Sequence, residues 1–343
     1  MKLAGKTCLL LYNSSNGSPP EEAKNADFDS TLNLRQDVKA VKQALKDLSI
    51  NVQTLGFRGL TAKVSSHFES TKPDFVFNLC ETLYNHRHKA LSEMYVAGWL
   101  ELLKIPYTGS PPLSLGLALN KMRCKQILRA GGLPVPPSVA VPVGEKPNLE
   151  SITPPFIIKP VREDGSFGIT KYSVVQTPDE AEAQVNLIHK EYQQSALVEE
   201  FIGGRELTVA VIDNPPRVFG IGEMDFNGLP SEEPKIISYR TKWAKAGPEL
   251  YDFPAQIEPH LKKRLEKMSL KAFELLGCQD YARIDFRVSE NRRPYILEVN
   301  PNPDLSPEEE FGKSAKALGL TYTNLVENIV ESALRRGTRV YFD

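Results

Sequence analysis

The chain has 343 residues, of which 41% are hydrophobic, so it is long enough to form two or three compact domains. Its formal net charge is −1 and no long block of like charges occurs, which argues against a nucleic acid or a membrane surface as a partner. The four cysteines, at positions 8, 80, 124 and 278, are too scattered for a zinc or redox motif and favour a reducing compartment.

The first hundred residues alternate strand-like and helix-like patterns. The apolar run Cys8–Tyr12 predicts a buried strand, and it is too short for a signal peptide or a membrane span, so we expect a cytoplasmic protein. Periodic apolar residues then predict a helix around 34–48, strands at 52–55 and 74–78, and a helix at 89–103.

Strands that alternate with helices predict an open parallel sheet in this region. Such sheets bind ligands at the carboxyl ends of their strands. We therefore expect the loops at 13–16 and 78–81 to lie at a functional edge. His86 and His88 have no third metal ligand nearby in the sequence, which favours a loop role over a metal site.

The middle of the chain contains a lysine that a strand would bury. Pro155–Pro160 is an apolar strand that carries Lys159, and a buried ammonium group requires an anionic partner such as a nucleotide phosphate. Gly165 and Gly168 follow and permit a tight loop whose backbone N–H groups can face phosphate oxygens. Such a loop alone is more often a simple turn, but a lysine at the end of the preceding strand favours a phosphate site.

The next segments continue the alternation of helices and strands. We expect a helix at 178–193 capped by Thr177, a strand at 197–202, a long polar loop that ends at Pro254, and a helix at 259–276. A loop of more than about a dozen residues is usually functional or disordered. Helices at about 309–318 and 322–336 are expected to close the chain.

Two strands with alternating polar side chains precede these last helices. Arg283, Asp285 and Arg287 share one face of the first strand, and Glu298 and Asn300 share one face of the second. The turn at 290–293 predicts a hairpin that brings Arg283, Asp285, Glu298 and Asn300 together. Two carboxylates and an amide oxygen suit Mg²⁺, and the arginine can hold a phosphate or an oxyanion. A hairpin with a solvated polar face is the alternative for the strands alone.

These motifs resemble those of ATP-grasp ligases, and of the D-alanine–D-alanine ligase group in particular. The similarity covers nearly the whole chain and includes Pro106–Gly109 and the pattern Arg-x-Asp followed by Glu-x-Asn-x-Asn-Pro. It implies a three-domain ATP-grasp fold that combines α/β and α+β parts. An N-terminal parallel-sheet domain would span 1–110, and a central lobe (111–198) and a C-terminal lobe with the metal site (199–343) would clamp ATP.

The resemblance also implies a role for individual residues. Backbone groups of 200–202 would read the adenine edge, Glu199 would accept from the adenine amino group, and Glu206 would bind ribose hydroxyls. One or two Mg²⁺ ions, with Mn²⁺ as an alternative, would be bound by Asp285, Glu298 and Asn300. Arg283, Lys242 and Ser166 would act in catalysis. The full set expected to bind ATP is Lys121, Lys159, Gly165, Ser166, Glu199, Glu200, Phe201, Ile202, Glu206 and Lys242.

The sequence departs from the family pattern on the substrate side. The family's glutamate that holds an amine has no equivalent in Ser14–Ser18, and its loop serine and tyrosine are replaced by Gly165 and Trp243. Asp304 stands where the family has glycine. The ATP and metal half therefore matches closely, whereas much of the D-alanine half does not. The residues expected to contact substrate are Asn302, Asp304, Arg240 and Arg162.

The resemblance implies an ATP-dependent carboxylate–amine ligase that forms a peptide-type bond through an acyl phosphate. Its small-molecule substrates would be amino acids or small peptides. One alternative is a D-alanine–D-alanine ligase of cell-wall synthesis with a variant amine pocket. Another is an ATP-binding protein without ligase chemistry, against which the intact set of catalytic and metal-binding residues argues. A homodimer is implied by the resemblance alone.

Overall fold

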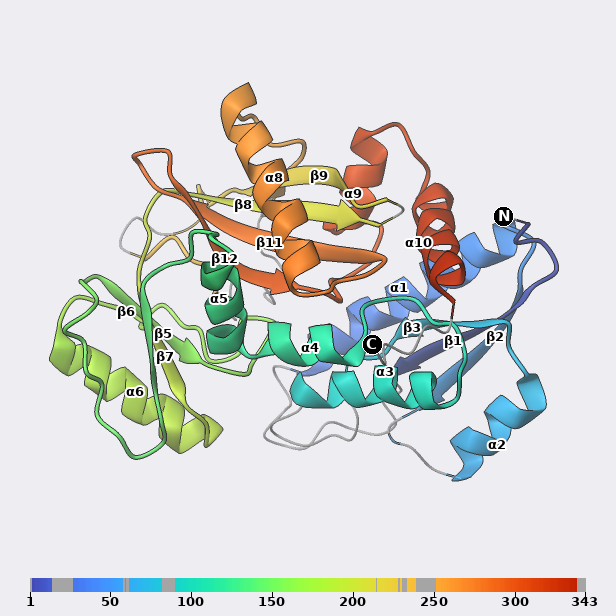
Figure 1. Cartoon of the computed structure of the whole chain (residues 1–343), viewed down its shortest axis with the longest axis horizontal. Helices are drawn as coiled ribbons and strands as arrows, with labels where there is room; N and C mark the ends of the chain where they lie inside the picture. Colours follow the sequence, from blue (N-terminus) through green and yellow to red (C-terminus); the bar gives the residue numbers. More distant parts are fainter. Residues whose placement is uncertain are drawn as a thin grey trace.

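The computed structural model describes residues 2–13, 27–57, 59, 62–81, 90–213, 215–227, 229, 233–238 and 251–337. Within these ranges the strands form three sheets, of order β2-β1-β3, β4-β7-β5-β6 and β10-β9-β8-β11-β12. Figure 1 shows the three sheets as neighbouring parts of one molecule with helices around them. One parallel and two antiparallel sheets give the mixed architecture that the sequence predicted.

The first sheet is parallel, as the alternation of strands and helices predicted. Its strands are β1 (Thr7–Asn13), β2 (Asn51–Phe57) and β3 (Phe75–Leu79), and its helices are α1 (Asp27–Asp47), α2 (Ala62–Thr71) and α3 (Glu93–Leu102), the last preceded by the short helix η2 (Ala90–Ser92). Side chains alternate along β1, so Leu10 joins the core under α1, and Leu9 joins the core under α3. At the carboxyl edge, the Glu81 N–H donates to Asn13 Oδ1 at 2.8 Å, so the ends of β1 and β3 meet there.

The second sheet is antiparallel and is covered by one helix. It contains β4 (Ser138–Val141), β5 (Phe156–Pro160), β6 (Val174–Val175) and β7 (Ala196–Glu200), with α6 (Pro178–Tyr192) packed on it. The predicted cap of α6 is confirmed: Thr177 accepts from the Glu180 N–H, and Glu180 accepts from the Thr177 N–H. Such a cap contributes about 1 kcal/mol. Two further helices, α4 (Pro112–Leu119) and α5 (Lys121–Ala130), connect this sheet to the first.

The third sheet is antiparallel and contains the predicted hairpin. Its strands are β8 (Arg205–Ile212), β9 (Arg217–Met224), β10 (Tyr251–Asp252), β11 (Tyr281–Val288) and β12 (Pro294–Asn300). On one face Ile284 and Phe286 pack against α8 (Pro259–Leu275), and on the other α9 (Glu310–Ala317) covers part of the sheet. The rest of that second face is where Arg283 and Asp285 lie.

The C-terminal helix α10 (Tyr322–Arg336) returns to the first sheet and packs beside α1, as Figure 1 shows. Its end is fixed by Asp280, a fully buried carboxylate. Asp280 accepts from the Gly109 N–H at 2.8 Å, from Ser332 at 2.8 Å and from Arg336 at 2.8 Å. Residues near both ends of the chain, such as Leu10 and Ile329, also belong to one hydrophobic core.

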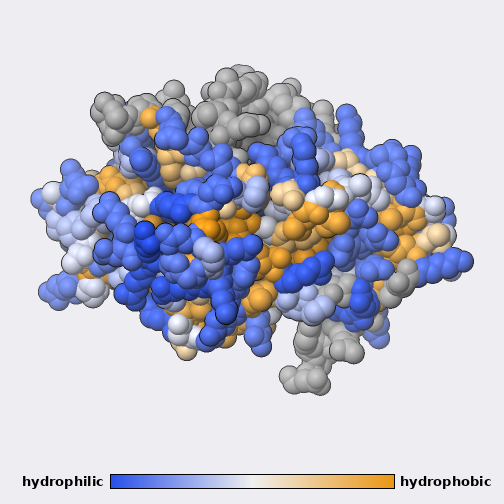
Figure 2. All heavy atoms as spheres, turned by 90° about the horizontal axis from the view of Figure 1, so that it is seen from above, coloured by the Kyte–Doolittle hydropathy of each residue, from blue (hydrophilic) through white to orange (hydrophobic). Residues whose placement is uncertain are grey.

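No helix in the described part of the chain is both long enough and apolar enough to cross a membrane. Figure 2 shows a face on which hydrophilic residues predominate and apolar residues gather in smaller patches. All four cysteines are buried and free of disulfides, as the sequence predicted. Burial raises the pKa of the Cys124 thiol to about 11, so this thiol stays protonated at neutral pH.

Candidate active site

The hairpin of β11 and β12 brings four polar side chains to one place. Arg283 is opposite Asn300, and Asp285 is opposite Glu298 in the strand register. Arg283 donates to both carboxylate oxygens of Asp285, at 2.7 and 2.8 Å. The predicted convergence of these residues is confirmed, and it places two carboxylates, an amide and a guanidinium on a single sheet face.

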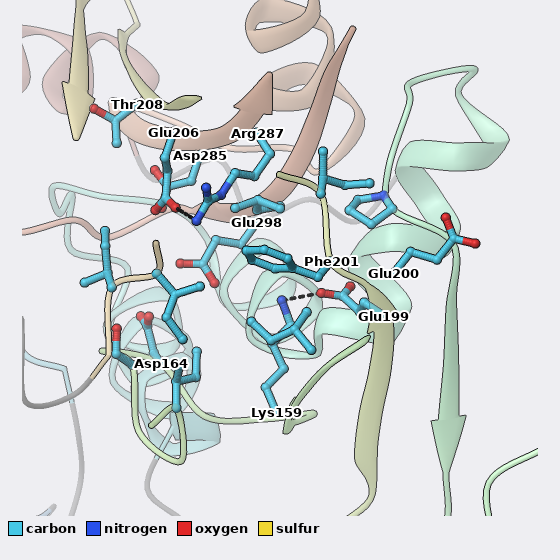
Figure 3. A pocket seen from close by; sticks show the side chains of 18 of the residues that line it. Lys159, Asp164, Glu199, Glu200, Phe201, Glu206, Thr208, Asp285, Arg287 and Glu298 are labelled. Atoms are coloured by element: carbon cyan, nitrogen blue, oxygen red, sulfur yellow. Dashed lines mark ion pairs between the residues drawn. The ribbon is translucent and has the colours of Figure 1, made fainter. Parts of the chain in front are cut away.

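A pocket of about 870 Å³, open to solvent, lies between this hairpin and the second sheet. The second sheet contributes Lys159 and the β7 end, the third sheet contributes Asp285 and Glu298, and the loop after β5 contributes Gly165 and Ser166. Figure 3 shows the side chains of Lys159, Asp285 and Glu298 pointing toward a shared space. The other lining residues are Pro136, Ile157, Asp164, Ile169, Glu199, Glu200, Phe201, Ile202, Glu206, Thr208, Ile236, Ile237, Arg283, Arg287 and Leu297.

Lys159 is buried, as predicted, but its anionic partner in the described structure is a protein carboxylate. Glu199 lies 2.5 Å from the Lys159 ammonium and 2.7 Å from that of Lys125. Burial opposes the charged form of Glu199, but the two lysines hold its pKa below its ordinary value. The predicted need for an anionic partner is confirmed, but the sequence named only a phosphate as an example, because Glu199 comes from the neighbouring strand β7.

Lys121 lies at the hairpin end of the site, at the start of α5. Its ammonium donates to the Glu163 carbonyl at 2.5 Å and is 3.4 Å from Glu298. Burial alone would lower the pKa of Lys121, but the carboxylates of Glu298, Asp164 and Glu199 together outweigh it and raise that pKa. A positive charge is therefore fixed beside one of the expected metal ligands.

The glycine-rich loop after β5 has the tight conformation that its sequence predicted. Gly165, Ser166 and Gly168 have φ values of 60°, 63° and 77°, in the left-handed region that favours glycine. A Cβ atom at Gly168 would come within 2.6 Å of Pro160, so this position has room only for glycine. The Gly165 N–H donates to Asp164 at 2.6 Å, and Ser166 lines the pocket.

The segment expected to read adenine is only partly available for that role. The N–H groups of Glu200 and Phe201 donate to the Pro137 and Pro155 carbonyls, at 3.0 and 2.7 Å. The Glu200 carboxylate accepts from Thr153 at 2.9 and 3.0 Å and points away from the pocket in Figure 3. The N–H groups of Glu200 and Phe201 are therefore already used, and only the other backbone groups of 200–202 remain to read the adenine edge.

Two buried charged residues at the site were given no role by sequence reasoning. Arg287 lines the pocket on the face that strand alternation predicted, and it pairs with Glu206 at 2.7 Å. Glu310, the first residue of α9, is 3% exposed and lies 3.5 Å from Arg283. Burial raises the pKa of Glu310 to about 8, Arg283 opposes this rise and Asp285 adds to it. Nothing in the sequence separates Glu310 from the two glutamates before it.

Of the four expected substrate contacts, two lie on the turn after β12. Asn302 donates to Glu93 and accepts from the Tyr281 hydroxyl at 3.0 Å. Asp304 accepts from the Ser306 N–H at 2.7 Å. Arg162 is exposed and does not line the pocket. Five expected positions or segments lie outside the described residues: Arg240, Lys242, Ser14–Ser18, Trp243 and the pair His86 and His88.

Three carboxylates near the turn after β12, outside the lining of the pocket of about 870 Å³, form what we call the acidic wall: Asp37, Glu93 and Asp304. Glu93 and Asp37 are buried, at 8% and 6% exposure, and Asp37 accepts from the Ser306 hydroxyl. Burial, with a further contribution from Asp304, raises the pKa of Asp37 to about 8. Burial also raises the pKa of Glu93 well above its ordinary value, while Asn302 opposes this.

Known proteins resemble this chain in both sequence and fold. The family model described as "D-ala D-ala ligase C-terminus" matches residues 127–331. A D-alanine–D-alanine ligase of Bartonella henselae is 32% identical over 292 residues, which are 82% of this chain and 89% of that protein. The uncharacterized protein y4sG of Sinorhizobium fredii is 33% identical over 264 residues, 76% of this chain and 75% of that protein.

The fold is similar to that of a solved ligase. The crystal structure of the D-alanine–D-alanine ligase from Bacillus anthracis, complexed with ATP, superimposes with a TM-score of 0.73. The superposition covers 98% of this chain and 100% of that one, at 21% sequence identity. The ATP-grasp fold that the sequence predicted is confirmed.

Proposed function

Because the chain belongs to the D-alanine–D-alanine ligase family, and is therefore an ATP-grasp ligase that forms C–N bonds, we propose that it joins two amino acids or small peptides at the hairpin pocket. The observation that carries the proposal is the pocket itself, because Lys159, Arg283, Asp285 and Glu298 all line one space. Lys159 belongs to the nucleotide-binding set expected from the sequence, Arg283 to the catalytic set, and Asp285 and Glu298 to the metal-binding set.

We place ATP across this pocket, with its base toward Phe201 and its phosphates toward the hairpin. The end near β7 is lined by apolar side chains that include Ile157, Ile202 and Leu297, which suits a purine. Lys159, Lys121 and the N–H groups of the glycine-rich loop suit phosphate oxygens. Glu199 would orient the two lysines that flank it and accept from the adenine amino group.

A divalent cation fits the hairpin end of the pocket. Asp285 and Glu298 are opposite each other and both line the pocket, and Asn300 follows on the same strand face. These are hard oxygen donors of the kind that Mg²⁺ prefers. Among the described residues no cluster of three or more His, Cys, Asp or Glu side chains could hold a metal, so Asn300 and the phosphates would have to complete the ligand set. When bound, Mg²⁺ would neutralise phosphate charge.

The reaction proceeds in two steps. The carboxylate oxygen of the first substrate attacks the γ-phosphorus, the bond to the β-phosphate oxygen breaks, and ADP leaves. The amine of the second substrate then attacks the acyl carbon, the C–O bond to phosphate breaks, and the amine loses a proton. Arg283 stabilises the oxyanion of the tetrahedral intermediate, which typically contributes about 3–4 kcal/mol.

The acidic wall supports amino-acid or peptide substrates. Its carboxylates suit the α-ammonium group that such substrates carry. The second candidate is a D-alanine–D-alanine ligase with a variant amine pocket, which the 32% identity to a ligase of that name favours. The other alternative from the sequence, an ATP-binding protein without ligase chemistry, is set aside because the chain belongs to a ligase family.

Phosphate release in the presence of ATP and Mg²⁺ tests the two candidates. We expect release only when a carboxylate and an amine substrate are both present, in a panel of amino acids and dipeptides. Turnover with D-alanine alone supports the second candidate. Nucleotide binding without turnover across the whole panel overturns both.

We further propose a homodimer in the cytoplasm. The homodimer rests on the family resemblance, and the compartment rests on four buried cysteines that form no disulfide. Light scattering on the purified chain measures the oligomeric state directly, and a mass of one chain contradicts the dimer.

A further inference from the structure

The Arg287 guanidinium lies over two aromatic rings at the pocket wall. It lies 5.4 Å from the centre of the Phe201 ring and 5.3 Å from that of Phe226, and the residue is 3% exposed. Both distances suit attraction between a cation and the face of a ring. The rings restrict the plane of the guanidinium, so its edge can donate in only a few directions.

The edge of the guanidinium joins three parts of the pocket. Arg287 donates to the Gly204 carbonyl at 3.1 Å and to the Lys235 carbonyl, and it pairs with Glu206 at 2.7 Å. Lys235 directly precedes Ile236 and Ile237, which line the pocket. One side chain therefore fixes the turn after β7, the pocket segment after β9 and a carboxylate on β8.

Glu206 depends on Arg287 for its charge and direction. It is 7% exposed, and burial raises its pKa while Arg287 opposes that rise. The Arg287 Nη2 nitrogen meets Glu206 while Nη1 donates to the Gly204 carbonyl, and a lysine's single ammonium cannot reproduce this set of directions. Figure 3 shows the pair on the same side of the pocket as Asp285.

The position of the pair along the strands indicates which part of a nucleotide it would meet. Glu206 is opposite Arg287, and two residues further along Thr208 is opposite Asp285. The pair therefore lies between the Phe201 end of the pocket and the expected metal ligands. In any nucleotide the sugar lies between the base and the phosphates, and sugar hydroxyls are donors that a carboxylate accepts.

We propose that Arg287 is a positioning residue that holds the Glu206 carboxylate toward the ribose, so that the site selects ribonucleotides over deoxyribonucleotides. The inference rests on the proposed function for the presence of ATP in this pocket. Arg287 would then set the sugar preference without being one of the residues proposed to bind the phosphates.

Calorimetric titration with ATP, 2′-deoxyATP and 3′-deoxyATP in the presence of Mg²⁺ tests the inference. We expect the wild-type chain to bind ATP at least about tenfold more tightly than at least one of the two deoxynucleotides. The missing sugar hydroxyl can no longer donate a hydrogen bond to the charged Glu206 carboxylate. In Arg287→Met, which keeps an apolar chain beside the two rings, we expect that preference to fall to about threefold or less.

Further variants separate positioning from folding. Arg287→Lys keeps the positive charge but not the fork, and we expect it to lose the preference as well; it reports on the inference where Arg287→Met does not fold. Arg293→Met is the matched control, because Arg293 lies on the same hairpin, 5.2 Å from the Tyr295 ring, and is exposed. We expect this control to keep the wild-type preference.

A double-mutant comparison tests whether Arg287 acts through Glu206. In a Glu206→Gln background, Arg287→Met should cause no further change in the ratio of the two affinities. Equal loss of affinity for ATP and the deoxynucleotides in Arg287→Met indicates a purely structural role and overturns the inference. An unchanged preference in Arg287→Met overturns it too. Failure of the wild-type chain to bind any of the nucleotides contradicts the proposed function instead.

Discussion

The nucleotide side of the pocket and the acidic wall hold buried carboxylates in different ways. On the nucleotide side a buried carboxylate lies next to a cation, as Glu199 does beside Lys159 at 2.5 Å. In the acidic wall the carboxylates accept from neutral groups: Glu93 accepts from the Asn302 amide, and Asp37 accepts from a serine hydroxyl. The pKa of Glu199 is consequently lowered, whereas those of Asp37 and Glu93 are raised.

This difference indicates what each side is built to receive. A carboxylate held between cations is already neutralised, so it orients its neighbours and leaves them able to meet an anion such as triphosphate. A buried carboxylate without a cation is destabilised when charged, and a bound ammonium group would relieve that cost. The charge pattern therefore supports an ATP site on one side and an ammonium-bearing substrate on the other.

The largest effect is expected from Glu298→Gln, which removes a carboxylate from the expected metal site. We expect turnover to fall by more than about a hundredfold, since even residues outside the direct ligand set can cost that much. The phosphate-release assay measures it, and circular dichroism checks the fold. Glu290→Gln, at an exposed position in the turn of the same hairpin, is the control. Normal turnover in Glu298→Gln contradicts the metal assignment.

Arg283→Met tests the proposed oxyanion donor, which lines the pocket and pairs with Asp285. We expect kcat to fall by about 10²–10³-fold, because the oxyanion loses its donor, with a smaller change in the KM for ATP. Steady-state kinetics separate the two constants. Arg292→Met, which removes an exposed arginine paired with Glu258 at 2.9 Å, is expected to leave both unchanged. An effect of Arg283→Met on KM alone would assign Arg283 to nucleotide binding.

Glu199→Gln tests the paired charges of the nucleotide side. It leaves Lys125 and Lys159 buried without their carboxylate, and we expect the free energy of unfolding to fall by about 3 kcal/mol. Glu223→Gln is the comparison, because Glu223 pairs with Arg205 at 2.6 Å in a more exposed place. That variant should cost about 1 kcal/mol or less. Equal costs in urea denaturation would show that burial does not distinguish the two pairs.

Asp37→Asn tests the acidic wall. Unlike Glu199→Gln, it is expected to increase stability relative to wild type as the pH rises. The folded-state pKa of about 8 lies above the ordinary value of 3.8, so the folded protein binds a proton that the unfolded chain has released between these pH values. Wild-type stability should therefore fall as pH rises through this window, by at most about 1.4 kcal/mol per pH unit from this group.

In Asp37→Asn this contribution disappears, so the variant gains stability relative to wild type as pH rises from about 4 to about 8. Urea denaturation at a series of pH values measures the difference. Asp47→Asn, an exposed change on the same helix, provides the control and should show no such trend. A difference that does not depend on pH would indicate that Asp37 is charged in the folded protein.

Local patterns were sufficient to predict much of the fold. Alternation along β11 and β12 predicted that Asp285 faces Glu298, because a hairpin pairs residues close in sequence. The parallel first sheet followed from apolar strands separated by amphipathic helices. The packing of α10 beside α1 could not be predicted, because neither helix sequence indicates which element the helix packs against.

The pairing of charges at the site depends on contacts that no local pattern encodes. Arg287 was placed on the correct face, but its partner Glu206 is 81 residues away along the chain. Glu310 is one of three consecutive glutamates, and only the packing of α9 against the third sheet buries it beside Arg283. In both cases the neighbouring strand or helix decides the role.

A crystal structure of the chain with Mg²⁺ and a non-hydrolysable ATP analogue tests the central assignment most directly. We expect the metal between Asp285 and Glu298, the triphosphate within reach of Lys121 and Lys159, and the purine beside Phe201. A purine bound away from Phe201, or a metal with neither carboxylate among its ligands, would contradict the account.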